Sequence, residues 1–243
     1  MEERVYGDLR ADKPAYVRAM FSAIAGSYDT VNTVLSLTRD RSWREFAASK
    51  AVAGSSGLIL DVATGTGELA RAIARRDGGS KVVGIDFCAP MLAKARLKSA
   101  ARAADGAGEH VLGDVLQLPF PDETFDCVTI GFGLRNVSDL RRAFAEMARV
   151  VRPGGHVVSL ELTRPSPRLF RSAHSFVMFR VLPHVGKLMS GSREAYTYLP
   201  ESICEFLPPE EVKAVMESQG LRDVRVHRLT LGIATVHVGV KGG

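Results

Sequence analysis

Between residues 57 and 162, short runs of β-branched and aliphatic residues alternate with stretches of helical period. The apolar runs cover residues 58–62, 81–87, 110–115, 125–132 and 156–162. This alternation is typical of βαβ units, whose strands form a parallel sheet covered by helices on both faces. The sequence therefore predicts a doubly wound α/β domain.

The C-terminal part predicts the edge of the same sheet. A helix closed by Gly220 is followed by two alternating strands, joined through the short link TLG. Such a link favours an antiparallel hairpin, so the sheet should be mostly parallel with a reversed terminal pair. We expect a single domain over 1–243 with these parts: an N-terminal helical cap at 14–53, a nucleoside-binding core at 57–162, an inserted cap at 163–209, and a C-terminal helix and hairpin at 210–243.

Length and composition limit the class of protein. A chain of 243 residues can bury one sizeable core with an added cap. No run approaches the roughly 18 apolar residues of a membrane-spanning helix, and the first residues lack the apolar core of a signal peptide. We therefore expect a cytoplasmic protein. Its three cysteines, Cys88, Cys127 and Cys204, are too few and too scattered for a disulfide framework or a zinc site, and we expect no metal.

The net charge of +5 belongs to one segment. Residues 164–193 contain six Lys or Arg and no Asp or Glu, so they carry +6 and the remainder carries −1. The same segment is rich in Phe, Leu and Met. A basic amphipathic stretch can lie on an anionic membrane surface, which predicts a peripheral contact with the inner face of the membrane. An ordinary solvated face remains an alternative. Nucleic-acid binding is not expected, because no aromatic platform or recognition helix is evident.

A glycine loop follows the first predicted strand. In LDVATGTGELA, Gly65 and Gly67 stand between a strand and a helix, where glycine permits a tight turn and close approach of a ligand. Asp86 ends the next strand, 21 residues after Gly65, where its carboxylate can accept hydrogen bonds from ribose hydroxyls. This arrangement predicts a nucleoside ligand.

Two nucleoside cofactors compete for this loop. GTGELA also satisfies the dinucleotide pattern GxGxxA, so the motif alone leaves NAD open. Asp61, ahead of the glycines, suits a cationic amino acid group and would repel a pyrophosphate. Asp114, at the end of the third predicted strand, suits the adenine amino group. These carboxylates and the reversed terminal hairpin favour S-adenosylmethionine.

Several segments resemble a known family. The chain is similar to the class I S-adenosylmethionine-dependent methyltransferases in DVATGTGEL, VGIDFCAPML, LPFPDETFD and EMARVVRPGG. More narrowly, from about residue 17 onward it resembles the UbiE-type menaquinone and ubiquinone biosynthesis C-methyltransferases in MFSAIAGSYDTVNTVLSL, TIGFGLRNVSD, YTYLPESI and LTLGIATVHVGVK. The chain departs from the pattern at Ala63, where many class members have a glycine, and at His174, where an aromatic residue is expected.

The resemblance implies a seven-stranded, Rossmann-like sheet and methylation of a ring carbon in a polyprenylated hydroquinone, of the naphthoquinol or the benzoquinol type. It implies a donor site formed by Tyr28, Asp61, Ala63, Gly65, Thr66, Gly67, Asp86, Phe87, Met91, Asp114, Val115 and Gly131. Alternatives are a small-molecule O- or N-methyltransferase, a nucleotide-dependent oxidoreductase and a catalytically silent partner that presents quinol. The oligomeric state stays open, a homodimer included.

The segment GFGLRN lies at the carboxyl end of the fourth predicted strand, where ligands bind in open α/β sheets. We expect Arg135 to face the region where methyl donor and acceptor meet. A phenol ionises near pKa 10, so stabilising a phenolate at pH 7 requires about 4 kcal/mol, much of which a nearby guanidinium can supply. Asn136 either contacts ligand or holds Arg135. The candidate catalytic residues are Arg135, Asn136, Tyr196 and His174, with His174 as a possible proton acceptor and a packed histidine as its alternative.

Overall fold

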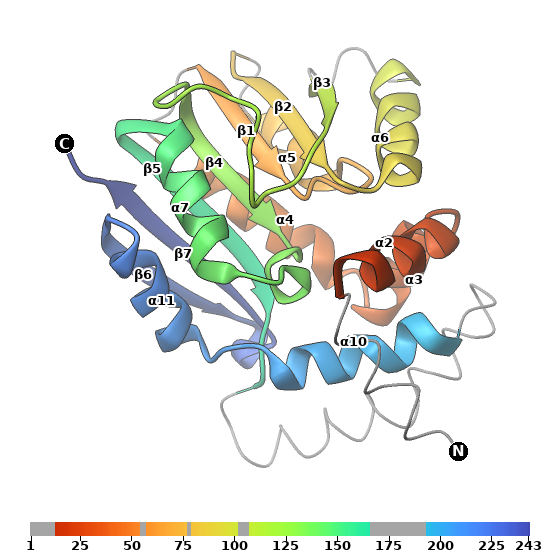
Figure 1. Ribbon diagram of the computed structural model, residues 1–243. Helices are drawn as coiled ribbons and strands as arrows, with labels where there is room; N and C mark the ends of the chain where they lie inside the picture. The colour runs from red at the N-terminus through yellow and green to blue at the C-terminus, as the bar shows by residue number, and fades with distance from the viewer. Residues whose placement is uncertain (1–12, 54–56, 77–78, 102–106, 166–192) are drawn as a thin grey trace.

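The computed structural model describes residues 13–53, 57–76, 79–101, 107–165 and 193–243. A seven-stranded sheet forms its centre, in the order β3-β2-β1-β4-β5-β7-β6 (Figure 1). The strands are β1 (Leu58–Val62), β2 (Lys81–Asp86), β3 (Ala107–Leu112), β4 (Phe125–Gly131), β5 (Val151–Leu162), β6 (Leu221–Leu229) and β7 (Ala234–Lys241). The doubly wound α/β prediction is confirmed.

The direction of the strands follows the prediction closely. All neighbouring pairs from β3 to β5 are parallel, and the hairpin of β6 and β7 is antiparallel. The strand β7 is inserted between β5 and β6 and is antiparallel to both. Because the chain turns back twice there, β6 runs in the same direction as the parallel strands, and β7 is the reversed strand of the described sheet.

Helices cover both faces of the sheet, with α4 and α5 on one face and α7 and α11 on the other, while α6 packs along β2 and β3 (Figure 1). The helices are α2 (Lys13–Ile24), α3 (Tyr28–Leu35), α4 (Arg39–Ala51), α5 (Glu68–Arg76), α6 (Ala89–Ala101), α7 (Leu140–Val150), α10 (Arg193–Glu205) and α11 (Pro209–Ser218), with the short 3-10 helices η2 (Leu134–Asn136) and η4 (Thr230–Gly232). Within the described ranges, no helix is long and apolar enough to cross a membrane.

Two predicted strand boundaries are wrong. The third strand covers 107–112 rather than 110–115, so Asp114 lies in the loop beyond the strand. The fifth strand begins at residue 151 rather than 156, because Val151 pairs with Phe125 of β4; the RPGG segment lies in a register shift, and regular pairing resumes between His156 and Cys127. Gly154 adopts φ 77° there, a conformation that glycine tolerates best.

The N-terminal helices sit beyond one end of the sheet. In Figure 1, α2 and α3 lie beside α10, and their contact is formed by Met20, Ile24, Val31 and Ala195. The buried Trp43 of α4 packs on the sheet and donates a hydrogen bond from Nε1 to the Thr230 hydroxyl of η4, at 2.8 Å. The segment 14–53, predicted to be helical, consists of α2, α3 and α4. Most of the predicted cap at 163–209, including the basic segment and His174, lies outside the described residues.

Candidate active site

The turn after β1 has an unusual backbone. Ala63, Gly65 and Gly67 all have positive φ, at 50°, 57° and 80°. A Cβ on Gly65 would meet open space, whereas one on Gly67 would lie 3.3 Å from the Cβ of Ala95. Glycine suits this conformation, but an alanine in it is strained by about 1–2 kcal/mol. The turn therefore leaves the backbone of Gly65 accessible, while Gly67 packs closely against Ala95 of α6.

Asp86 holds this turn in place. Its Oδ2 accepts a hydrogen bond from the Gly65 amide at 2.7 Å, and its Oδ1 accepts one from the Cys88 amide at 2.8 Å. Burial raises the pKa of Asp86, and these amide bonds oppose that effect. Each carboxylate oxygen keeps a lone pair that can accept a hydroxyl proton. The side chain is thus fixed at the end of β2 with capacity for a ribose.

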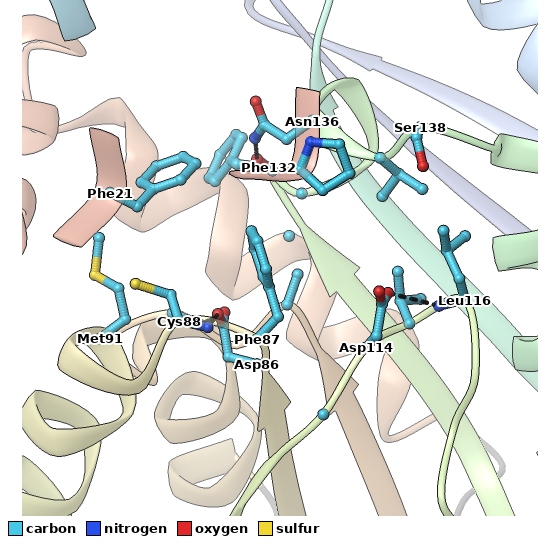
Figure 2. A pocket seen from close by; sticks show the side chains of 18 of the residues that line it. Phe21, Asp86, Phe87, Cys88, Met91, Asp114, Leu116, Phe132, Asn136 and Ser138 are labelled. Atoms are coloured by element: carbon cyan, nitrogen blue, oxygen red, sulfur yellow. Dashed lines mark hydrogen bonds between the residues drawn. The ribbon is translucent and has the colours of Figure 1, made fainter. Parts of the chain in front are cut away.

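A first cavity of about 90 Å³ lies over the carboxyl ends of β1, β2 and β4. Figure 2 shows Phe21, Met91 and Asp86 on one side of it and Asp114 and Leu116 on the other. The predicted donor residues that line it are Tyr28, Ala63, Gly65, Asp86, Phe87, Met91, Asp114, Val115 and Gly131. Apolar walls with a few placed carboxylates suit an adenine and a ribose.

A second cavity of about 40 Å³ adjoins the first, with which it shares Tyr28, Ala63, Gly65, Gly131 and Phe132. The predicted residues Asp61 and Thr66 line it. Asp61 lies in register with Thr129 of β4 and accepts hydrogen bonds from the hydroxyls of Thr129, at 2.6 Å, and Thr64, at 2.7 Å. Burial raises the pKa of Asp61 to about 6, and these hydrogen bonds oppose it. A cation placed beside Asp61 would favour its ionised form.

The helical cap is tied to the glycine turn by a polar network. Asp29 of α3 accepts a hydrogen bond from the Thr66 hydroxyl at 2.5 Å and from Lys98 at 2.6 Å. Lys98 also contacts Glu68, at 2.7 Å. Although burial opposes it, Lys98 lowers the pKa of Glu68. Three separate helices therefore meet around Thr66, beside the cavities.

The GFGLRN segment forms a strained turn after β4. Phe132 adopts φ 58°, which is uncommon for a bulky residue. Its carbonyl accepts hydrogen bonds from Arg135 Nη1, at 2.7 Å, and from Asn136 Nδ2, at 3.4 Å. The Tyr198 hydroxyl donates to Asn136 Oδ1 at 3.1 Å. Asn136 therefore links the turn to α10 through Tyr198, and it also lines the first cavity.

Arg135 forms a buried ion pair that the sequence did not predict. Its Nη1 lies 2.5 Å from Glu161 Oε1, and the two side chains are only 6% and 1% exposed. Glu161 also accepts hydrogen bonds from the Arg135 amide at 3.1 Å and the Leu162 amide at 2.8 Å. In the described part of the chain, the buried Nε of Arg135 has no hydrogen-bond partner. The only available signal for Glu161 was an acidic residue within an otherwise apolar strand.

Two tyrosines report how strongly Arg135 acts on a nearby phenol. The Arg135 charge works to lower the pKa of both Tyr28 and Tyr198, but burial is the larger effect and raises both values. At Tyr198 the charge of Glu161 also raises the pKa and so opposes Arg135. The charge of Arg135 therefore reaches both of these phenols, although burial outweighs it.

A third cavity, of about 1260 Å³, lies between α2, α10, α11 and the start of α7. Arg135 and Tyr198 line it, and Val137 and Ser138 line both this cavity and the first. Lys13 donates hydrogen bonds to the carbonyls of Arg135, at 3.0 Å, and Val137, at 3.3 Å, and so supports η2 from this side. The structure thus places Arg135 and Asn136 where the two cavities meet.

Two of the predicted catalytic residues have no described side-chain position. Tyr196 belongs to α10, but its side chain is outside the described part of the structure, and His174 lies outside the described residues altogether. Their roles stay predictions.

Comparison with known proteins identifies the family. Residues 9–241 match the model of the ubiE/COQ5 methyltransferase family. The chain is 45% identical to the demethylmenaquinone methyltransferase of Deinococcus radiodurans, over 96% of this chain and 95% of that one. It is also 45% identical to the ubiquinone/menaquinone biosynthesis C-methyltransferase UbiE of Geobacter sulfurreducens, over 95% and 90%.

Solved structures support the fold. The chain superimposes on a possible histamine N-methyltransferase from Thermotoga maritima with a TM-score of 0.63 and 18% identity, covering 92% of this chain and 98% of that one. A phosphoethanolamine N-methyltransferase from Haemonchus contortus, in complex with S-adenosylhomocysteine, gives a TM-score of 0.60 at 17% identity, covering 82% and 52%. Because the family model and the relatives match nearly the whole chain, the chain belongs to the ubiE/COQ5 methyltransferase family.

Proposed function

We propose that the protein transfers the methyl group of S-adenosylmethionine to a ring carbon of a polyprenylated hydroquinone in menaquinone or ubiquinone biosynthesis. The observation that carries this proposal is the 45% identity to a demethylmenaquinone methyltransferase over nearly the whole chain. The geometry agrees, since a cleft suited to a nucleoside meets a larger cavity at η2.

The donor occupies the first and second cavities. Its ribose hydroxyls bind Asp86, and its adenine lies toward Asp114 and Met91. The amino acid group reaches the second cavity, where its ammonium group is paired with Asp61. This orientation directs the sulfonium methyl toward the turn at Asn136 and the third cavity, which receives the acceptor.

The reaction requires an ionised acceptor hydroxyl, which pushes electron density onto the ortho ring carbon. That carbon's electron pair forms the new bond to the methyl group, while the carbon–sulfur bond breaks and its pair stays on sulfur, giving S-adenosylhomocysteine. The methylated ring then loses the proton from the attacked carbon to water, and the carbon–hydrogen electron pair restores aromaticity. Holding both reactants at attack distance contributes much of the acceleration.

Arg135, which lines the third cavity, stabilises the developing phenolate by its charge. Since Glu161 compensates its charge, Arg135 does not supply the whole 4 kcal/mol or so that ionisation at neutral pH requires. A separate group must accept the hydroxyl proton, and His174 remains our candidate, while Tyr196 remains a candidate for contact with the substrate. Asn136, fixed by Tyr198, orients the acceptor.

The test is incubation with S-adenosylmethionine and each reduced prenylquinone, naphthoquinol or benzoquinol, followed by mass analysis of the products. One added methyl group on a quinol supports the proposal and selects between the two ring types. Ligand binding without turnover would favour a quinol-presenting partner, and binding of NAD(P)H in place of the methyl donor would favour an oxidoreductase; either result overturns the proposal.

We also propose that residues 164–193 contact an anionic membrane, where the prenyl tail of the substrate resides. Their +6 charge and apolar side chains support this. Sedimentation with vesicles should show binding that requires anionic lipid and weakens with salt. Equal binding to neutral vesicles would contradict the proposal.

A further inference from the structure

The proposed donor carries an α-amino acid group, which holds a cation and an anion one carbon apart. The second cavity, with room for about three waters, can accept these two groups. Asp61 provides a partner for the ammonium group, but none of the donor residues predicted from the sequence is a cation for the carboxylate. Arg44 of α4 lines the same cavity and has the required charge.

Arg44 is held rigidly in position. Its Nη1 lies 2.5 Å from Oδ2 of the buried Asp40, one helical turn earlier. The other carboxylate oxygen of Asp40, Oδ1, accepts a hydrogen bond from the Ser36 hydroxyl at 2.9 Å. Its guanidinium stacks over the Phe132 ring, 5.2 Å from the ring centre. The side chain is 11% exposed. Among the described residues, Asp40 is its one hydrogen-bond partner, so its remaining N–H groups are available to a ligand.

The charge of Arg44 acts on the walls of the second cavity. Burial raises the pKa of Tyr28, and Arg44 opposes that rise. Together with the larger effect of Lys98, Arg44 also helps to lower the pKa of Glu68. Both residues line the second cavity, so the guanidinium charge is felt where the donor's amino acid group is placed.

We propose that Arg44 binds the α-carboxylate of the methyl donor, opposite Asp61, which binds the ammonium group. The inference rests on the proposed function. A guanidinium offers paired N–H donors that match the geometry of a carboxylate. Because Asp61 belongs to β1 and Arg44 to α4, the bound amino acid group bridges the sheet and the N-terminal cap.

Two ligands that differ in the amino acid group test this. S-adenosylhomocysteine carries the group, whereas 5′-methylthioadenosine has the same adenosine and thioether without it. Calorimetry should show that Arg44→Met weakens binding of S-adenosylhomocysteine by about 10- to 100-fold, as expected for a lost hydrogen-bonded charge pair. Binding of methylthioadenosine should change by less than about threefold, and Arg44→Lys should recover part of the loss.

Arg41→Met is the matched control, because Arg41 is an exposed cation on the same helix. It should leave the affinities for both ligands unchanged. Retained methylthioadenosine binding shows that the Arg44→Met site is folded. An equal loss for both ligands, or no loss for either, would overturn the role of Arg44 and leave the proposed function standing. Failure of the wild-type protein to bind either ligand would overturn both.

Discussion

The ion pair of Arg135 and Glu161 allows a quantitative prediction of stability. Both side chains are almost fully buried, and Glu161 pairs with Nη1 of Arg135 and accepts hydrogen bonds from two backbone amides. Glu161→Leu removes these acceptors and leaves a positive charge buried without its partner. Removing one member of such a pair costs about 3–5 kcal/mol. Since about 1 kcal/mol shifts the melting temperature of a domain of this size by roughly 2–4 °C, we expect a fall of about 6–20 °C.

A double-mutant cycle separates the pair from its surroundings. Arg135→Met leaves a buried carboxylate without its partner, which should also cost about 3–5 kcal/mol. The double variant Arg135→Met with Glu161→Leu removes both charges and should be more stable than the sum of the two single effects predicts.

Urea unfolding measures each variant, and the exposed pair of Arg228 and Glu210 provides the control. Those side chains lie 2.7 Å apart but are 45% and 63% exposed, so Glu210→Leu should cost less than about 1 kcal/mol. If Glu161→Leu costs no more than Glu210→Leu, or if the cycle shows no coupling, the buried charge pair does not have the energetic role assigned here.

Three further predictions concern the glycine turn and its contacts. Because burial raises the pKa of Asp61 from 3.8 to about 6, ionisation of this group lowers the stability of the folded protein as pH rises from 3.8 to 6. In urea unfolding, Asp61→Asn should therefore stabilise the free protein by up to about 3 kcal/mol near pH 8 and hardly at all near pH 4. Equal effects at both pH values would contradict this prediction. Ala63→Gly removes the Cβ that is strained at positive φ, so it should stabilise the protein by about 0.5–1 kcal/mol in the same assay. A loss of stability would show that Ala63 is not strained in this turn. Lys98→Met breaks two partly exposed contacts, with Asp29 and Glu68, so the free energy of unfolding should change by less than about 1 kcal/mol. Because these contacts tie the N-terminal cap to the glycine turn, stopped-flow release of S-adenosylhomocysteine should become several-fold faster, and an unchanged release rate would show that they do not retain the ligand.

The sheet was largely predictable because its strands are short apolar runs between turn residues. The runs at 58–62, 81–87 and 125–132 match β1, β2 and β4 within one residue. The ends of β3 and β5 were not predictable, because pairing across register shifts decides them: Ala107 pairs with Val82, and Val151 with Phe125. Local sequence does not contain such tertiary pairing.

The site was predictable where its chemistry is local in the sequence. The spacing of Gly65 and Asp86 follows from one βαβ unit, and the structure joins them by a hydrogen bond. The ionic partners were not predictable, because they come from distant elements. Glu161 lies 26 residues from Arg135, and Arg44 belongs to a helix that precedes the sheet. Only the fold brings these charges together, and it converts Arg135 from a free cation to a paired one.

The central claim is that a methyl group passes from a sulfonium nucleoside to a ring carbon of a prenylated quinol. The most direct measurement uses S-adenosylmethionine with an isotope-labelled methyl group, and follows the label in the purified product by NMR. The account predicts a methyl signal bonded to the aromatic ring carbon, together with one equivalent of S-adenosylhomocysteine. A labelled methyl on oxygen, or no labelled quinol at all, would contradict it.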